Sequence, residues 1–197
     1  RVDRRQRQMC IRDRVKALKK DPKSIVVGGG GSIGGQGWMK IALLAKAAGV
    51  NPSELRYAAF EGGSEHYMAL MGKHVDLVTG SASEIASQKG NDIRTLAVFS
   101  EERLPGDLAE IPTAREQGYE IQWPLIRGYF VGPDVPKEQV QWWRDAFAKL
   151  EASPDFERYM VERDVLPMYV SGDELQALVK KQVAEYRELG REFGLVE

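Results

Sequence analysis

A glycine-rich segment between a β-branched run and an apolar helical pattern constrains this fold more than any other feature. Residues 25–49 read IVVGGGGSIGGQGWMKIALLAKAAG and place seven glycines between positions 28 and 37. A strand that passes through glycines into a helix directs several backbone N–H groups at one point, where the helix dipole adds positive potential. The segment therefore predicts a turn that holds an anion, either a phosphate or a carboxylate.

The phosphate interpretation depends on a dinucleotide-binding pattern. Gly29, Gly31 and Gly34 fit G-x-G-x-x-G after a strand, and Glu61 follows the next strand, where an acid can bind a ribose. A segment with so many glycines also matches this pattern by chance. The Walker pattern fails, because no Gly-Lys-Ser/Thr follows. An oxidoreductase that depends on NAD or NADP stays open as an alternative.

The rest of the chain alternates short β-rich runs with amphipathic helices, which is typical of an α/β fold with a parallel sheet. The predicted strands cover residues 24–27, 54–60, 74–80, 92–99 and 126–133. The predicted helices cover residues 36–48, 64–71, 113–118, 137–152, 154–164 and 172–192, with another from Ser81 or Ser83 to Gln88. The change to mostly helices near residues 126–136 predicts a domain boundary.

Two further loops favour the carboxylate interpretation. FEGGS (60–64) and VTGSASE (78–84) each follow a predicted strand and open a helix with small or hydroxyl residues. Because the carboxyl ends of parallel strands share one edge of a sheet, the three turns can converge on one ligand. The turns carry no acid–base machinery, which indicates capture without catalysis. The predicted ligand contacts are Gly31, Ser32, Gly34, Gly35, Gln36, Gly62, Gly63, Ser64, Thr79, Gly80 and Ser81.

Three longer blocks carry a family resemblance. They run from GGGSIGGQG at residue 29 to SASE at residue 84, then IRTLAVFSEERLPGDLAEIPTAREQGYEI (93–121) and RGYFVGPDVPKEQV (127–140). Their order and spacing resemble the substrate-binding proteins of tripartite tricarboxylate transporters, the TctC or Bug family. The resemblance implies an α/β, type II periplasmic binding protein-like fold, in which two lobes close on a small organic carboxylate and deliver it to a membrane permease. We expect a periplasmic monomer without a cofactor.

The resemblance also implies how the chain is organised. Residues 15–126 correspond to lobe two, and residues 127–197 to the crossing strand and the C-terminal helical part of lobe one, so the N-terminal part of lobe one is expected to be missing. Arg127, at the crossing, is either a partner for the ligand carboxylate or a structural ion pair at the hinge. RVDRRQRQMCIRDR resembles translated sequencing-adapter DNA, so residues 1–14 are expected to be non-native or disordered.

Local departures from the family leave the ligand open. Many members place a hydroxyl residue, an acid and a histidine after the Gly-Gly pair, where this chain has Gln36, Gly37 and Trp38. Trp123 either walls the pocket or packs in the core. The effector-binding lobe of a transcription regulator shares the two-lobed design and is a further alternative.

Charge and residue usage exclude other classes of function. Beyond residue 14 the chain carries 22 Lys and Arg against 27 Asp and Glu, a net charge of −5, whereas nucleic-acid binders are usually basic. Cys10 is the only cysteine, so residues 15–197 contain no disulfide or thiolate metal site. His66 and His74 have no partner at the spacing of metal ligands, and no metal is expected.

Overall fold

The computed structural model describes residues 10–62, 64–163, 165–166 and 168–196. The chain divides into two compact units, Arg1–Pro124 and Leu125–Glu197. This division falls close to residue 126, where the sequence predicts the end of lobe two. The assignment of the two units to the lobes of a binding protein stays a prediction.

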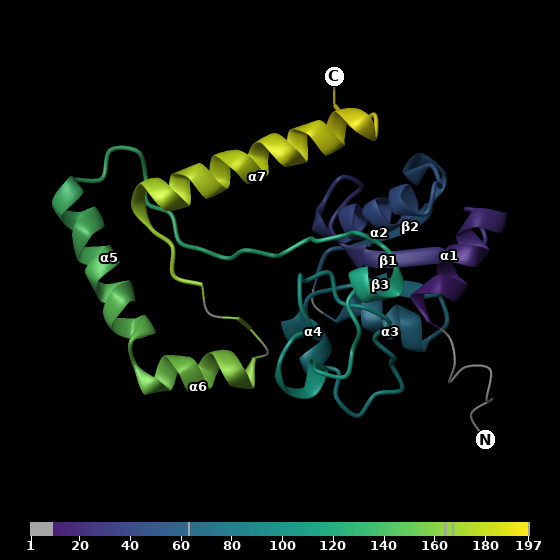
Figure 1. Ribbon diagram of the computed structural model, residues 1–197, viewed down its shortest axis with the longest axis horizontal. Helices are drawn as coiled ribbons and strands as arrows, with labels where there is room; N and C mark the ends of the chain where they lie inside the picture. Colours follow the sequence, from purple (N-terminus) through teal and green to yellow (C-terminus); the bar gives the residue numbers. More distant parts are fainter. Residues whose placement is uncertain (1–9, 63, 164, 167, 197) are drawn as a thin grey trace. The chain divides into compact units, whose positions relative to one another are not determined.

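A three-stranded parallel sheet forms the centre of the first unit (Figure 1). Its strands are β1 (Val26–Gly30), β2 (Arg56–Phe60) and β3 (Leu77–Thr79), in the order β2-β1-β3. Gly28 of β1 pairs with Ala58 on one side and with Val78 on the other. All three carboxyl ends therefore lie at one edge of the sheet, as the glycine-rich turns require.

Two helices of the first unit, α2 and α3, pack against this sheet, and α1 packs against α2. The helices of the first unit are α1 (Ile11–Lys20), α2 (Gln36–Ala47), α3 (Glu65–Met71) and α4 (Ala82–Ala86), with the 3₁₀ turns η2 (Pro52–Glu54), η3 (Gly106–Leu108) and η4 (Arg115–Gln117). Val27 is fully buried in the middle of β1, and its neighbours in the core come from helices on either side of it in sequence. The main core residues are Ile11, Val15, Leu18, Ile25, Val27, Ile41, Leu44, Ala45 and Ile121.

Helix α1 begins at Ile11, so residues 11–14 of the segment expected to be non-native or disordered are helical and not disordered, while a non-native origin stays a prediction. Ile11, Val15 and Leu18 follow the i, i+4, i+7 spacing of one helical face, and each is at most 4% exposed. Burial of this face in the core stabilises the helix despite the arginines around it. Residues 1–9 of the segment expected to be non-native lie outside the described residues.

All five predicted strands differ from the structure, and those at 54–60 and 74–80 are shortened to Arg56–Phe60 and Leu77–Thr79. The first lies at Val26–Gly30 instead of 24–27, because the glycines themselves pair with β2 and β3. Residues 92–99 form only an isolated bridge between Val98 and Thr113, since the backbone of Val98 bonds to the loop at Pro112 and Ala114. Residues 126–133 are not a strand, because no strand is described in the second unit for them to pair with.

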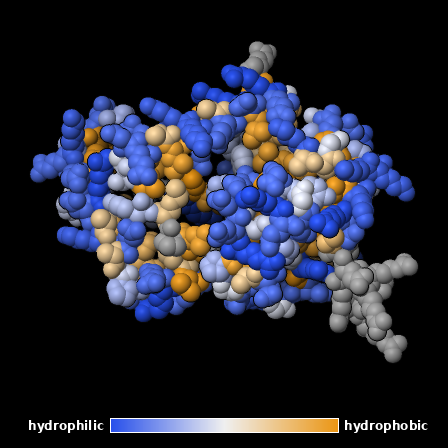
Figure 2. Space-filling model, viewed as in Figure 1, coloured by the Kyte–Doolittle hydropathy of each residue, from blue (hydrophilic) through white to orange (hydrophobic). Residues whose placement is uncertain are grey.

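The second unit consists of the helices α5 (Lys137–Glu151), α6 (Pro154–Glu162) and α7 (Gly172–Glu192), close to the predicted bounds. Helix α6 begins with a local signal: Pro154 occupies its first turn, and the Ser153 hydroxyl accepts the N–H of Phe156 at 3.2 Å. Trp142 and Trp143 of α5 are both exposed, at 62% and 48%. Figure 2 shows several other hydrophobic residues reaching the surface of this unit.

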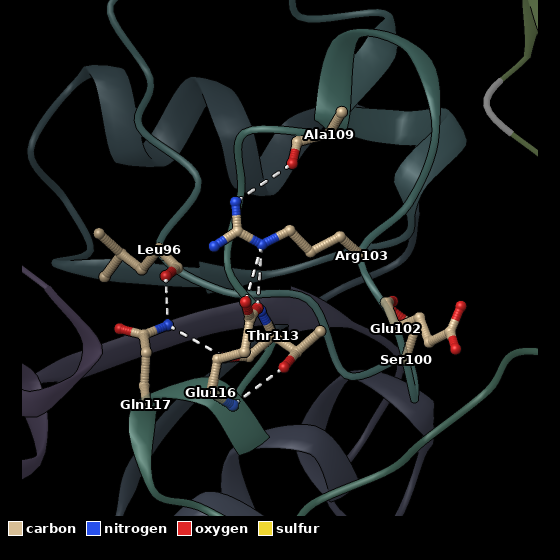
Figure 3. Close-up of polar contacts among 8 residues, drawn as sticks. All are labelled: Leu96, Ser100, Glu102, Arg103, Ala109, Thr113, Glu116 and Gln117. Carbon is tan, nitrogen blue, oxygen red and sulfur yellow. Dashed lines mark hydrogen bonds and ion pairs between the residues drawn. The ribbon is translucent and has the colours of Figure 1, made fainter.

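A polar network holds residues 96–118, which have no strand of their own (Figure 3). Arg103 Nε donates to both carboxylate oxygens of Glu116, at 2.9 and 3.1 Å. Glu116 also accepts the backbone N–H of Thr113 at 2.7 Å, and the Thr113 hydroxyl accepts the N–H of Glu116 at 3.0 Å. Gln117 Nε2 donates to the carbonyl of Leu96 at 3.0 Å. The network ties both ends of the segment together.

The variant Glu116→Gln is expected to lower the midpoint of thermal unfolding at neutral pH. Hydrogen bonds from Arg103 and Thr113 hold the pKa of Glu116 below its ordinary value of 4.5. The carboxylate therefore contributes stability above about pH 4.5, and this contribution is lost as the pH falls through the lowered pKa. Unfolding midpoints of the wild type and the variant should converge in acid. Glu120→Gln is the control, because Glu120 is 80% exposed and only contacts Arg115 at 3.4 Å.

Candidate anion-binding site

The turns that follow the three strands lie side by side. In the first turn, the Gly31 N–H donates to the carbonyl of Phe60, at the end of β2, at 2.8 Å. At the end of β3, the Thr79 hydroxyl donates to the carbonyl of Gly37 in α2 at 2.7 Å. These bonds connect all three turns at the carboxyl edge of the sheet. The structure thus brings together the described residues that the sequence predicts as ligand contacts in the first unit.

The first turn, residues 31–35, presents open backbone at the start of α2. Gly31 and Gly34 have φ values of +80° and +84°, in the region that favours glycine. The Gly35 N–H donates to the carbonyl of Ser32 at 2.9 Å and closes the turn. Gly35 caps α2 without a side chain, and the first turn of α2 contains no acidic residue. The positive end of the helix therefore has no carboxylate in its own first turn.

Two glycines let α2 sit directly on the sheet. A Cβ on Gly37 would lie 2.7 Å from the carbonyl oxygen of Gly30 and 2.6 Å from the hydroxyl of Tyr57. A Cβ on Gly29 would lie 2.6 Å from the hydroxyls of both Tyr57 and Thr79. Burial raises the pKa of Tyr57 to about 12, so its hydroxyl stays protonated and donates to Gly30. The close approach fixes where the N-terminus of α2 points.

The second turn leads into a helix whose first turn is already acidic. Gly62 has a φ of +142°, and Ser64 caps α3 without a side-chain hydrogen bond. Glu65 already places an acidic side chain in the first turn of α3. Gly63, also predicted as a ligand contact, lies outside the described residues.

The third turn already holds a carboxylate of the chain itself. Oε2 of Glu84 accepts the backbone N–H of Ser81 at 2.6 Å and its hydroxyl at 2.8 Å, in a capping box. The Thr79 hydroxyl is likewise engaged, with Gly37. A Cβ on Gly80 would collide with the hydroxyl of Tyr67, so this glycine makes room for packing. Among the three turns, the first is the one whose donors are best placed for an external ligand.

Lys40 adds positive charge that the sequence analysis missed. It lies one helical turn after Gln36 on α2, and its ammonium donates to the carbonyl of Gly80 at 2.6 Å. The i, i+4 spacing from Gln36 is the signal that could have found it. Lys40 therefore brings a cation to the same edge as the three turns.

Gln36 has a fixed side-chain orientation. The indole Nε1–H of Trp123 donates to Oε1 of Gln36 at 2.7 Å. The backbone N–H of Trp123 donates to the carbonyl of Phe99 at 2.8 Å, which anchors the backbone of this residue. Trp123 is half-buried, and its indole contacts Gln36, a predicted ligand residue, directly. Its role as a wall of the pocket stays a prediction.

Arg127 belongs to the second unit, Leu125–Glu197, and its role at the ligand stays a prediction. A hollow of about 530 Å³ in the first unit is lined by Leu43, Lys46, Ala47 and residues 118–122. It adjoins the C-terminal half of α2, away from the glycine turns.

The described residues also bear on a metal site and on a membrane span. No group of three or more His, Cys, Asp or Glu residues there is arranged to hold a metal ion. No helix in the described part of the chain has the length and apolar character to cross a membrane.

A sequence model of the tripartite tricarboxylate transporter family receptor matches residues 6–195. The chain belongs to this family. A curated relative, the UPF0065 protein in the gbd 5' region of Cupriavidus necator, is 25% identical over 154 residues, which cover 78% of the chain and 46% of that protein. The chain thus spans about half the length of this relative.

Solved structures share the fold of the receptor. A TctC solute binding protein from Polaromonas, without ligand, is 25% identical with a TM-score of 0.70, covering 93% of the chain and 62% of that structure. An R. palustris protein with adipate is 20% identical with a TM-score of 0.77, covering 94% and 61%. MatC from Rhodopseudomonas palustris, with bound malate, is 16% identical with a TM-score of 0.74, covering 91% and 61%.

Family membership decides between the alternatives. The matching family is that of the transporter receptor, and a solved structure of the same α/β fold is a TctC solute binding protein. The predicted family and fold class are therefore confirmed, and the oxidoreductase and regulator alternatives lose their support. The structure also shows why the dinucleotide pattern misleads: Gly29 lies inside β1, where its missing side chain makes room for Tyr57 and Thr79.

Proposed function

We propose that this receptor captures a small organic carboxylate at the N-terminus of α2 and delivers it to the permease of a tripartite transporter in the periplasm. The first turn would bind one carboxylate group through the N–H groups of Gln36 and Gly37 and the hydroxyl of Ser32. The ammonium of Lys40, one helical turn after Gln36 in α2, would add electrostatic attraction for the carboxylate. Arg127 stays a candidate for pairing with a ligand carboxylate.

One observation supports this proposal above the others. Of the three neighbouring helix N-termini, α2 is the long one, at 12 residues, and the one without an acidic residue in its first turn. A helix dipole of this length favours a negative charge at its N-terminus. Structural relatives solved with adipate and with malate are consistent with a carboxylate as that charge.

Titration with dicarboxylates tests the proposal. Malate, adipate and succinate are added at constant ionic strength while tryptophan fluorescence is followed, because Trp123 contacts Gln36 in the site. We expect a saturable change with at least one dicarboxylate and none with adipamide, the neutral diamide of adipate. An equal response to adipamide, or no saturable response to the whole panel, would contradict carboxylate capture.

A charge placed in the first turn locates the site. Ser32→Asp is expected to weaken dicarboxylate binding by more than about tenfold, because like charges placed together repel strongly in a binding site. Ser32 is exposed, so folding should be unaffected. The control is Ser53→Asp, the same substitution at an exposed position in η2. If both variants bind as the wild type does, the ligand is held elsewhere.

A further inference from the structure

We propose that Trp123 positions Gln36 as a fixed hydrogen-bond donor, and that this pair makes the site select organic acids over the corresponding amino acids. The inference rests on the proposed carboxylate function of the first turn. It adds a determinant of specificity at Gln36, the first residue of α2.

The chemistry of the contact fixes the direction of the amide. An indole N–H can only donate, so the group that faces it at 2.7 Å must be the amide oxygen of Gln36. The amide nitrogen is then directed away from Trp123 with both of its hydrogens. No acceptor for this nitrogen is found in the part of the chain that the structure describes.

The position of the amide gives these hydrogens a role. Gln36 is the first residue of α2, directly after the glycine turn, and its side chain is exposed. A ligand carboxylate at the helix N-terminus would therefore meet the donors of Gln36 beside it. A hydroxyl or a second oxygen on the ligand can accept from them.

An ammonium group on the ligand would be disfavoured at the same place. It has three donors and no acceptor, so it would face the Gln36 hydrogens without a hydrogen bond and would also meet the positive end of the helix. With a fixed amide, the site cannot avoid this mismatch by turning the oxygen toward the ligand, because that would break the bond to Trp123. Trp123 thereby acts on selectivity without touching the ligand.

The experiment compares succinate with aspartate, which differ by the α-amino group. The wild type is expected to bind succinate about tenfold more tightly than aspartate, the scale of one hydrogen bond to a charged group. Gln36→Glu keeps an oxygen for Trp123 but replaces the donor with a negative charge, so succinate should weaken and the preference should disappear. Trp123→Phe should reduce the preference by about threefold with little change in thermal stability. Gln122→Glu, an exposed glutamine beside Trp123, is the matched control and should keep the wild-type ratio.

The outcomes separate the two proposals. If the wild type binds neither of these ligands and also fails to bind malate and adipate, the proposed function falls and this inference falls with it. If succinate binds but the ratio of the two affinities is the same in the wild type, Gln36→Glu and Trp123→Phe, the inference alone is overturned. A ratio that changes in both variants and stays constant in Gln122→Glu supports it.

Discussion

Replacing Gly37 with alanine is expected to destabilise the first unit by about 3 kcal/mol, the upper part of the range for overpacked sites. The new Cβ would lie 2.7 Å from the carbonyl oxygen of Gly30 and 3.1 Å from its backbone nitrogen. Tyr57 could move its hydroxyl aside, but the backbone of a central strand cannot. Alanine gains about 1 kcal/mol of helix propensity over glycine, which is too small to compensate.

Urea unfolding of Gly37→Ala and Gly30→Ala measures this effect. Gly30 lies at the end of the same strand, and a Cβ there would meet no atom within 4 Å, so Gly30→Ala should change stability by less than about 0.5 kcal/mol. The pair tests the packing directly because both variants add one methyl group. Equal unfolding midpoints for the two variants would mean that α2 does not sit on the sheet as described.

Replacing His66 with leucine is expected to remove an acid-sensitive step in stability. His66 is 1% exposed, lies beside Tyr67 with ring centroids 4.2 Å apart, and both of its ring nitrogens are buried without a hydrogen-bond partner in the described structure. Burial lowers the pKa of His66 from its ordinary value of 6.5, an effect that the nearby Glu84 partly opposes. The imidazole is therefore neutral in the folded protein.

The sign of the pH dependence follows from the lowered pKa. Below about pH 6.5 the unfolded chain takes up a proton that the folded protein excludes, so stability falls with decreasing pH until the folded pKa is reached. Above pH 6.5 this loss is absent. His66→Leu should abolish the loss and also gain about 1–3 kcal/mol at neutral pH, since no unpaired polar group stays buried.

Unfolding of the wild type and His66→Leu at several pH values between 5 and 8 tests this prediction. The control is His74→Leu, because His74 is the only other histidine and is exposed. His74→Leu should keep the wild-type slope of stability with pH. The idea fails if His66→Leu keeps that slope as well.

Local sequence signals predicted much of the fold. Amphipathic periodicity predicted α2, α5, α6 and α7 close to their observed bounds. The S-x-x-E spacing from Ser81 to Glu84 is also local, and it indicates a capping box in which the chain fills its own helix N-terminus. Helix bounds and caps are readable because their interactions join residues three or four positions apart.

Pairing between distant residues could not be read in the same way. Residues 92–99 have high β propensity, but in the structure they lie beside a loop and not a strand, so only an isolated bridge forms. In the sequence, the apolar residues of α1 alternate with arginines, and the segment was not predicted to be helical. In the structure, its apolar face joins Val27 and Ile41 in the core. Strand formation and burial depend on which other segments lie beside a segment in the fold, and the sequence of that segment alone does not identify them.

The sequence by itself determined that strands end in glycine turns at helix N-termini, because the residues that make such a turn are adjacent in the chain. Only the tertiary structure decided which of these helix N-termini is closed by a carboxylate of the chain and how the side chains there are held. Glu84 closes the third turn, and Trp123, which is 87 positions away, orients Gln36 at the first. A hydrogen bond depends on distance in space, so its partners become known only when the chain is folded.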